Sequence, residues 1–260
     1  MPEPAAPASP GPAASDAASG ALLKVEGLSI AFGGIRAVDD LSFSVAPGRI
    51  VALMGPNGAG KTTTFHMIAG VHAPSAGRVI FDGRDITGLR PDKRCRVGLA
   101  RTFQITQPFD DLSVVENVMV GAMSRHARLS HARDDAARYV EMVGLGERMD
   151  VLAKGLSTGQ RKRLELARAM ATRPKLLLMD EVTGGVDQKS LPGLIDLVLG
   201  LRREGLTLIV VEHNMRVIND LADHAIFMNR GVKMAEGPPA EIARHPDVVE
   251  LYLGEGAAHG

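Results

Sequence analysis

One run of eight residues matches the G-x-x-x-x-G-K-[ST] pattern of a phosphate-binding loop at every fixed position. The run is Gly55, Pro56, Asn57, Gly58, Ala59, Gly60, Lys61 and Thr62. Its glycines let the backbone curl until successive N–H groups point inward at phosphate oxygens. The run stands between an apolar strand predicted over 49–54 and a helix predicted over 61–69, whose start adds partial positive charge. We therefore predict a nucleotide site in which Lys61 reaches the β- and γ-phosphates, Thr62 binds Mg²⁺ and Thr63 contacts the nucleotide.

Two carboxylates follow a second apolar strand. The segment 176–179 reads Leu-Leu-Leu-Met and delivers Asp180 and Glu181 at its carboxyl end. Ligands of open α/β sheets bind at that edge. An acidic pair after a strand is usually a solvated turn when it stands alone, but behind a phosphate loop it favours catalysis. We predict that Asp180 holds Mg²⁺ through water and that Glu181 orients or deprotonates an attacking water.

A phosphate loop alone is compatible with kinases, GTPases, helicases and transport ATPases. A second segment narrows the choice; it reads Leu156, Ser157, Thr158, Gly159 and Gln160. Its serine and second glycine fall at a predicted helix start, where free N–H groups and a hydroxyl can face a phosphate. The segment resembles the L-S-G-G-Q signature of ABC ATPases. Thr158 replaces the third-position glycine, and the importers of that family often carry such a substitution.

The resemblance implies an ATP-binding and ATP-hydrolysing subunit of an ABC transporter. In that family two subunits meet head to tail, and the signature of each closes over the γ-phosphate held by the other's phosphate loop. It is a contribution in trans, comparable in logic to an arginine finger. An isolated monomer is therefore expected to hydrolyse ATP slowly.

Two further positions match the family in the catalytic region. Gln104 occupies the Q-loop position, which implies that it senses Mg²⁺ and the attacking water and joins the membrane partner's movement to the site. His213 ends an apolar strand and matches the switch histidine that contacts the γ-phosphate. Outside this context a glutamine after a strand is usually a surface residue, and a histidine there is usually a cap or a core residue.

Two other matches lie at the rim of the expected site. Asp187 matches the aspartate of the D-loop along the dimer interface. Val182 stands where the family usually has proline, and Gly184-Gly185 frees the backbone, so the shape of this loop stays open. Phe32 fits the aromatic residue that stacks on adenine, although a phenylalanine in a strand is more often part of the core.

The elements expected to position these residues alternate between strand and helix, which implies a parallel sheet covered on both faces. With the resemblance, this predicts an α/β fold: a P-loop NTPase core of the ABC type, with an N-terminal antiparallel β subdomain and an inserted α-helical subdomain at about 91–165. Within the insert, Ser113 and Glu116 open one helix as a capping box, and a second helix covers 132–143. Residues 1–20, rich in Pro and Ala, are predicted to be a disordered tail, and 21–260 a single ABC ATP-binding domain.

Composition limits the possible partners. Thirty basic and thirty acidic side chains cancel, so no basic field marks a nucleic-acid binder and we expect no nucleic-acid partner. The single cysteine, Cys95, has no internal disulfide partner, which fits a reducing compartment. No apolar stretch approaches the roughly 18–20 residues that cross a bilayer. We expect a peripheral subunit on the cytoplasmic side of the inner (plasma) membrane.

Within the superfamily, the chain most resembles the longer, G-type ATPase of branched-chain amino acid importers. The stretches 32–38, 101–104 and 245–254 carry this likeness. The alternatives are the ATPase of lipopolysaccharide export and importers of urea or amides, because an ATPase subunit does not contact the cargo. Implied partners are a second ATPase subunit, identical or related, transmembrane permease subunits and, indirectly, an extracytoplasmic substrate-binding protein.

Non-transport ABC proteins fit the sequence less well. The gap of about 95 residues between phosphate loop and signature has no sustained heptads, so the long coiled coil of chromosome-associated types is missing. Ribosome-associated types carry two cassettes, and this chain has one. The presence of both Glu181 and His213 argues against a regulatory module without turnover.

Overall fold

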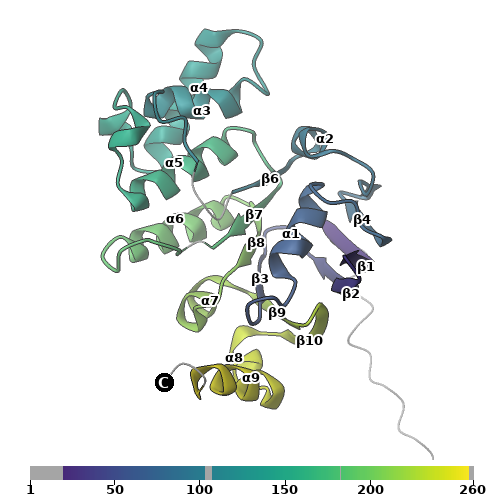
Figure 1. The fold of residues 1–260 in the computed structure, drawn as a ribbon. Helices are drawn as coiled ribbons and strands as arrows, with labels where there is room; N and C mark the ends of the chain where they lie inside the picture. The colour runs from purple at the N-terminus through teal and green to yellow at the C-terminus, as the bar shows by residue number, and fades with distance from the viewer. Residues whose placement is uncertain (1–19, 103–106, 182, 258–260) are drawn as a thin grey trace, which may run out of the picture.

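The computed structural model describes residues 20–102, 107–181 and 183–257 (Figure 1). In chain order the elements are β1 (Leu23–Phe32), β2 (Ile35–Val45), β3 (Ile50–Met54), α1 (Lys61–Ala69), β4 (Ala76–Phe81), β5 (Arg84–Asp85), α2 (Pro91–Val97), β6 (Leu99–Arg101), α3 (Val114–Ala122), α4 (Leu129–Met142), the 3-10 turns η1 (Gly146–Arg148) and η2 (Ala153–Gly155), α5 (Thr158–Met170), β7 (Leu176–Asp180), α6 (Leu191–Arg203), β8 (Thr207–Val211), α7 (Met215–Leu221), β9 (His224–Asn229), β10 (Val232–Gly237), α8 (Pro239–Ile242) and α9 (Pro246–Ala257). Across these described ranges, none of the helices combines the length and apolarity that a bilayer crossing demands.

The strands form two sheets. Four of them make an antiparallel sheet in the order β2-β1-β4-β5. Six make the second sheet in the order β10-β9-β3-β8-β7-β6, in which only β10 runs antiparallel to its neighbour. The predicted α/β class, with an antiparallel β part beside a parallel core, is confirmed.

Alternate residues of the parallel strands face two separate cores. On one face, Val51, Leu53 and Leu178 pack with α1 and the antiparallel sheet. On the other face, Ala52 and Met179 pack with α5, α6, α7 and the helices α3 and α4. Because both faces are covered, the strand residues are apolar almost without interruption, as expected for a buried parallel sheet.

The helical subdomain consists of α3, α4 and the first part of α5, and Figure 1 places α3 and α4 at the end of the molecule far from α8 and α9. The predicted capping box is present, since the Ser113 hydroxyl accepts from the backbone N–H of Glu116 and the Glu116 carboxylate accepts from that of Ser113. This box fixes where α3 begins.

The insert begins later than the sequence indicated. Residues 91–101 belong to the core, because β6 pairs with β7 in the parallel sheet. In α2, the buried guanidinium of Arg94 donates to the carbonyls of Met67 and Ile68 at 2.8 and 2.6 Å and so closes the last turn of α1. A strand of three residues is too short to show alternation, so the pattern did not reveal it.

The order of the parallel strands brings the chemistry-bearing segments to one edge. β3 ends at the phosphate loop, β7 ends at Asp180, and β8 ends just before Glu212 and His213. In the sheet these strands are neighbours in the order β3-β8-β7, all parallel. Their carboxyl ends therefore lie side by side at the edge where open α/β sheets bind ligands.

Candidate nucleotide-binding site

The phosphate loop is a left-handed turn leading into α1. Gly55, Gly58 and Gly60 have φ values of 141°, 78° and 98°, which glycine adopts without strain. The Lys61 ammonium donates to the carbonyls of Gly55 and Pro56 at 2.6 and 2.8 Å, so it lies over the loop. The start of α1 at Lys61 adds the partial positive charge of a helix N-terminus.

Close packing from behind makes two of these glycines sterically obligatory. A Cβ at Gly55 would collide with the carbonyl of Met228, and one at Gly60 with the carbonyl of Ala37. The turn after β9 adds support, because the Gly231 N–H donates to the Ala59 carbonyl at 3.0 Å. The loop is thus braced by β9 and the segment after it.

Asp180 is a buried carboxylate, 4% exposed. Burial raises its pKa above the ordinary value, and the charge of Glu181 adds to the rise. The cations Arg101, Lys162 and Lys61 work against it. A carboxylate whose ionised form is disfavoured in this way gains from a nearby cation, and together with the exposed hydroxyl of Thr62 it offers the oxygen ligands that Mg²⁺ requires. The donor set therefore fits that ion.

Glu181 has a left-handed backbone, with φ of 51°. Such a conformation is uncommon for a residue with a Cβ. Both of its peptide groups are engaged, because its N–H donates to the Val211 carbonyl at 3.1 Å and its carbonyl accepts from the Lys162 ammonium at 3.0 Å. Lys162 comes from α5, so the signature helix holds the backbone of the predicted catalytic glutamate.

His213 lies at the end of β8 with its side chain 66% exposed. The residue before it, Glu212, is 1% exposed and holds the segment in place. One Glu212 oxygen accepts from the backbone N–H groups of His213 and Asn214 at 3.0 and 3.2 Å. The other accepts from the hydroxyl and N–H of Thr183 at 2.9 and 3.3 Å.

The signature segment forms the start of α5 as a second capping box. The Ser157 hydroxyl accepts from the N–H of Gln160, and the Gln160 carboxamide oxygen accepts from the N–H of Ser157 at 3.0 Å. Both Ser157 and Thr158 are exposed. Ser157, with Gly159 and Gln160, borders an open hollow of about 570 Å³ whose lining otherwise comes from the helical subdomain and the N-cap of α6, Ser190.

Comparisons with known proteins agree with this geometry. A family model described as "ABC transporter" matches residues 38–184, which is more than half of the chain. The chain belongs to the ABC transporter family. It is the ATP-binding subunit type of that family, which hydrolyses ATP for a transporter. A second model, described as "Branched-chain amino acid ATP-binding cassette transporter", matches the end of this ABC ATPase, residues 232–258.

Relatives of the ABC ATPase match along nearly the whole chain. The branched-chain amino acid transport ATP-binding protein BraF of Pseudomonas aeruginosa is 37% identical over 251 residues, covering 90% of this chain and 98% of the relative. LivG of Escherichia coli K12 is 35% identical over 253 residues with the same coverage. The lipopolysaccharide export ATP-binding protein LptB of the same organism is 37% identical over 236 residues, again covering 90% and 98%.

Solved structures of ATP-binding cassettes also match along nearly the whole chain. A nucleotide-free ATP-binding cassette from an ABC transporter has a TM-score of 0.82 at 31% identity, covering 89% of this chain and 98% of that one. The ADP conformation of MJ1267, an ATP-binding cassette of an ABC transporter, has the same TM-score and identity, with 90% and 99% covered.

Three other predicted positions of the ABC ATPase have distinct surroundings. Phe32 ends β1, is 46% exposed, and meets the His72 ring edge-on with centroids 5.4 Å apart, so it is not a core residue. Asp187 is exposed, and its carboxylate accepts from the hydroxyl and N–H of Ser190 and from the N–H of Lys189 in the turn before α6. These hydrogen bonds, those from Ser190 above all, hold the pKa of Asp187 below its ordinary value. Gln104 lies outside the described residues.

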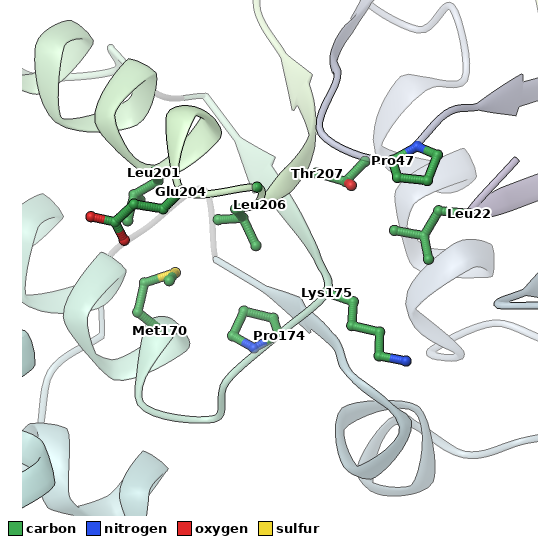
Figure 2. Close-up of a pocket in the computed structure, with 10 residues that line it drawn as sticks. Leu22, Pro47, Met170, Pro174, Lys175, Leu201, Glu204, Leu206 and Thr207 are labelled. Atoms are coloured by element: carbon green, nitrogen blue, oxygen red, sulfur yellow. The ribbon is translucent and has the colours of Figure 1, made fainter.

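A hollow of about 360 Å³ at the opposite edge of the sheet provides a contrast (Figure 2). Pro47, Lys175 and Thr207 stand where β3, β7 and β8 begin, and all three line it. This is the amino edge of the parallel strands, and its lining includes no part of the phosphate loop. The phosphate loop, Asp180 and Glu181 all lie at the opposite, carboxyl edge.

Glu212 was not among the residues to which the sequence assigned a role. The signal was present in the sequence, because a carboxylate directly after an apolar strand of a buried sheet needs partners. Those partners lie 29 residues away at Thr183, across the gap between two strands. Only the pairing of β7 with β8 reveals them.

Proposed function

We propose that this chain powers import of branched-chain amino acids by hydrolysing ATP as one of two ATPase subunits beneath a pair of permease subunits. The match of 232–258 to the branched-chain model and the names of BraF and LivG support this cargo. In this proposal the subunit sits on the cytoplasmic face of the inner membrane, and an extracytoplasmic substrate-binding protein delivers the amino acid.

The observation that carries the ATPase chemistry is the adjacency of three strand ends. β3, β8 and β7 bring the phosphate loop, His213 and Glu181 to one edge of the sheet. In the proposed site the N–H groups of 55–63 and the Lys61 ammonium bind the phosphates of ATP. The exposed ring of Phe32 stacks on the adenine.

Magnesium completes the proposed site. Thr62, Gln104 and Asp180 would hold it, with waters filling the other positions. When bound, the ion neutralises phosphate charge that develops during transfer. The raised pKa of Asp180 supports this assignment, because burial leaves the carboxylate in need of a cation.

Glu181 acts on the attacking water in this proposal. Val211 and Lys162 fix its backbone, so the carboxylate is oriented toward the attacking water before the reaction begins. His213, exposed at the end of the neighbouring strand, contacts the γ-phosphate. Gln104 joins the permease's movement to the same water.

A second subunit supplies the remaining contacts to the bound ATP. Ser157, Thr158, Gly159 and Gln160 form the start of α5, and Ser157, Gly159 and Gln160 border a hollow that the phosphate loop does not line. The two phosphate-binding helix starts of one chain therefore face different spaces. This supports a head-to-tail pair, in which each signature segment reaches the ATP on its partner and Asp187 lies along the interface.

A groove between the core and the helical subdomain is the proposed binding site for the permease. It has a volume of about 340 Å³ and is lined by parts of α1, α2, β6, α3 and α5, including the exposed Val71 and Val120. Arg101, just before the Q-loop segment, also lines it. In the proposal a helix of the permease lies in this groove and pushes on the segment that carries Gln104.

Replacing Glu181 tests the hydrolytic assignment. The variant Glu181→Gln should retain ATP binding but lose turnover, because an amide cannot take up the water's proton. We expect an ATP-bound dimer to accumulate, measured by light scattering together with steady-state phosphate release. The exposed Glu204, changed to Gln, is the matched control. Unchanged turnover in Glu181→Gln would refute the role.

Cargo is tested separately, because LptB is as similar to the chain as BraF is. Vesicles that hold the chain with its permease subunits and binding protein should accumulate labelled leucine in an ATP-dependent way. Uptake of urea or amides in place of leucine, or association with lipid-export components instead of an importer, would replace the proposed cargo while leaving the ATPase assignment intact.

A further inference from the structure

The candidate site contains a buried carboxylate that has no assigned role in nucleotide binding or hydrolysis. Glu212 is 1% exposed, and its two oxygens accept four hydrogen bonds. Two come from Thr183 on the segment that follows Glu181, and two come from the backbone of His213 and Asn214. Hydrogen bonds to a charged acceptor are roughly twice as strong as neutral ones.

These four bonds use the full acceptor capacity of the group. A carboxylate offers about four lone-pair positions, and here all of them are engaged within the chain. Glu212 therefore has none left for a metal ion, a nucleotide or a catalytic water. Burial of a charge is costly unless it is compensated, so the four donors account for its presence.

The two segments that it joins are those predicted to act on the γ-phosphate. β7 and β8 are paired with Asp180 beside Val211, so Glu181 and Glu212 leave the sheet as neighbours. Closer to the sheet, the Glu181 N–H donates to the Val211 carbonyl. Glu212 adds a charged bridge further out, between Thr183 and the His213 backbone.

We propose that Glu212 is a positioning residue that sets Glu181 and His213 in register with each other. Through it, a shift of the His213 segment is transmitted to the Thr183 segment and hence to the catalytic carboxylate. The inference rests on the proposed ATPase function, but the link itself is a property of the nucleotide-free chain.

The test uses pairs of nearly isosteric variants in the full chain. Glu212→Gln keeps the side-chain volume but leaves one acceptor oxygen for donors on two sides. Thr183→Val removes only the hydroxyl donor. Thr183→Ser keeps that donor and removes only the methyl group. Asp135→Asn is the matched control, because Asp135 is an equally buried carboxylate, 2% exposed, in the helical subdomain.

We expect Glu212→Gln to lower kcat about ten-fold or more, with KM for ATP changed less than about three-fold, because misplacement of a reacting group slows chemistry more than binding. Thr183→Val should lower kcat less, and Thr183→Ser should recover most of it. The double variant Glu212→Gln/Thr183→Val should lose little more than Glu212→Gln alone, since both act through one link.

Amide hydrogen exchange gives a readout that does not depend on ATP. In nucleotide-free Glu212→Gln, exchange should speed up in the peptides that carry Thr183, His213 and Asn214. In Asp135→Asn those peptides should retain their protection. A parallel loss of kcat in both variants, in proportion to their melting temperatures, would reduce Glu212 to a general stabilising role.

Two outcomes separate this inference from the proposed function. If the wild-type chain turns over ATP and Glu181→Gln abolishes it, yet Glu212→Gln shows wild-type kcat and wild-type exchange, the positioning role alone is refuted. If wild-type and Lys61→Ala show the same absence of turnover, the ATPase proposal fails, and exchange in Glu212→Gln still decides whether the link exists.

Discussion

Glu181 shows how a single residue depends on its neighbours. Its left-handed backbone persists because Val211 and Lys162 engage the peptide groups on both sides. The side chain then leaves the sheet in one fixed direction. Gly184 is so close that a Cβ there would stand 3.0 Å from one Glu181 carboxylate oxygen. A side chain at 184 would therefore press on the carboxylate and shift it.

The first prediction follows from that contact. Gly184→Ala should lower kcat about ten-fold while ATP affinity and melting temperature stay close to wild type, because the new methyl group displaces the Glu181 carboxylate. Steady-state ATPase kinetics and nucleotide titration measure the two effects. Gly200→Ala in α6 is the control, since its Cβ would meet only the end of Arg203, at 3.9 Å. Equal kcat in the two variants would contradict the prediction.

Asp180 gives the second prediction. Burial, with the help of Glu181, raises its pKa, so the folded chain binds this proton more tightly than the unfolded chain does. The resulting stabilisation is complete below the ordinary pKa of 3.8 and is lost as pH rises through the folded-state pKa. At neutral pH the ionised group therefore costs stability. Asp180→Asn should raise the melting temperature of the nucleotide-free chain at pH 7.

The same variant should lose the stabilisation that magnesium and ATP together give to the wild type, because the neutral amide lacks the negative charge with which the carboxylate attracts Mg²⁺. Thermal unfolding with and without Mg²⁺-ATP, across pH 4–8, measures both effects. Asp196→Asn, on the exposed face of α6, serves as the control. A lower melting temperature for nucleotide-free Asp180→Asn at pH 7 would show that the carboxylate stabilises the site.

At the scale of elements, two helices begin with the same device. Ser113 opens α3 and Ser157 opens α5, each in a capping box. Either serine changed to alanine should cost about 1 kcal/mol of stability. Ser157→Ala should also lower ATP turnover well beyond what Ser113→Ala does, because its helix start is proposed to face a partner's ATP. Melting temperatures and ATPase rates of the two variants decide; equal losses of rate would count against the proposed contact.

Sequence reasoning succeeded where local chemistry marks an element. The limits of α1 were predicted to the residue, because the motif ends in Gly60-Lys61 and Gly70 closes the helix in a left-handed cap. The phosphate loop and the carboxylates at 180–181 were placed for the same reason. Helix α4 starts three residues earlier than predicted, at Leu129, since Arg128 gives no capping signal.

The features that escaped depend on contacts distant in sequence. β6 is defined by its pairing with β7, some 75 residues later, and Glu212 by a bond to Thr183. β1 runs on to Phe32 through a register shift that no alternation pattern reveals. Strand pairing across the sheet carries this information, and a single sequence does not display it.

At the scale of the whole molecule, one carboxylate fastens the helical subdomain to the chain that re-enters the sheet. Asp135 of α4 is 2% exposed and accepts from His126 and Arg173 at 2.9 and 3.0 Å, and also from Arg138. Arg173 stands between α5 and β7. Burial acts to raise the pKa of Asp135, but these hydrogen bonds outweigh it and hold the pKa below its ordinary value.

Its contribution to stability is therefore present above the ordinary pKa of 3.8 and is lost as pH falls through the lower folded-state pKa. Asp135→Asn should destabilise the chain by about 1–3 kcal/mol at pH 7, because it leaves buried donors poorly paired. Urea unfolding at pH 7 and near pH 3 measures the difference, which should shrink at the lower pH. A variant equally destabilised at both values would contradict this.

The parallel sheet separates two hydrophobic cores. Leu53 and Met54 are adjacent in the chain, yet one faces the compartment shared with α1 and the other faces the compartment shared with α5 to α7. A substitution among the helices α3 to α7 therefore meets a different set of core side chains from a substitution in α1. The same nucleotide-binding core can thus be combined with different helical surfaces.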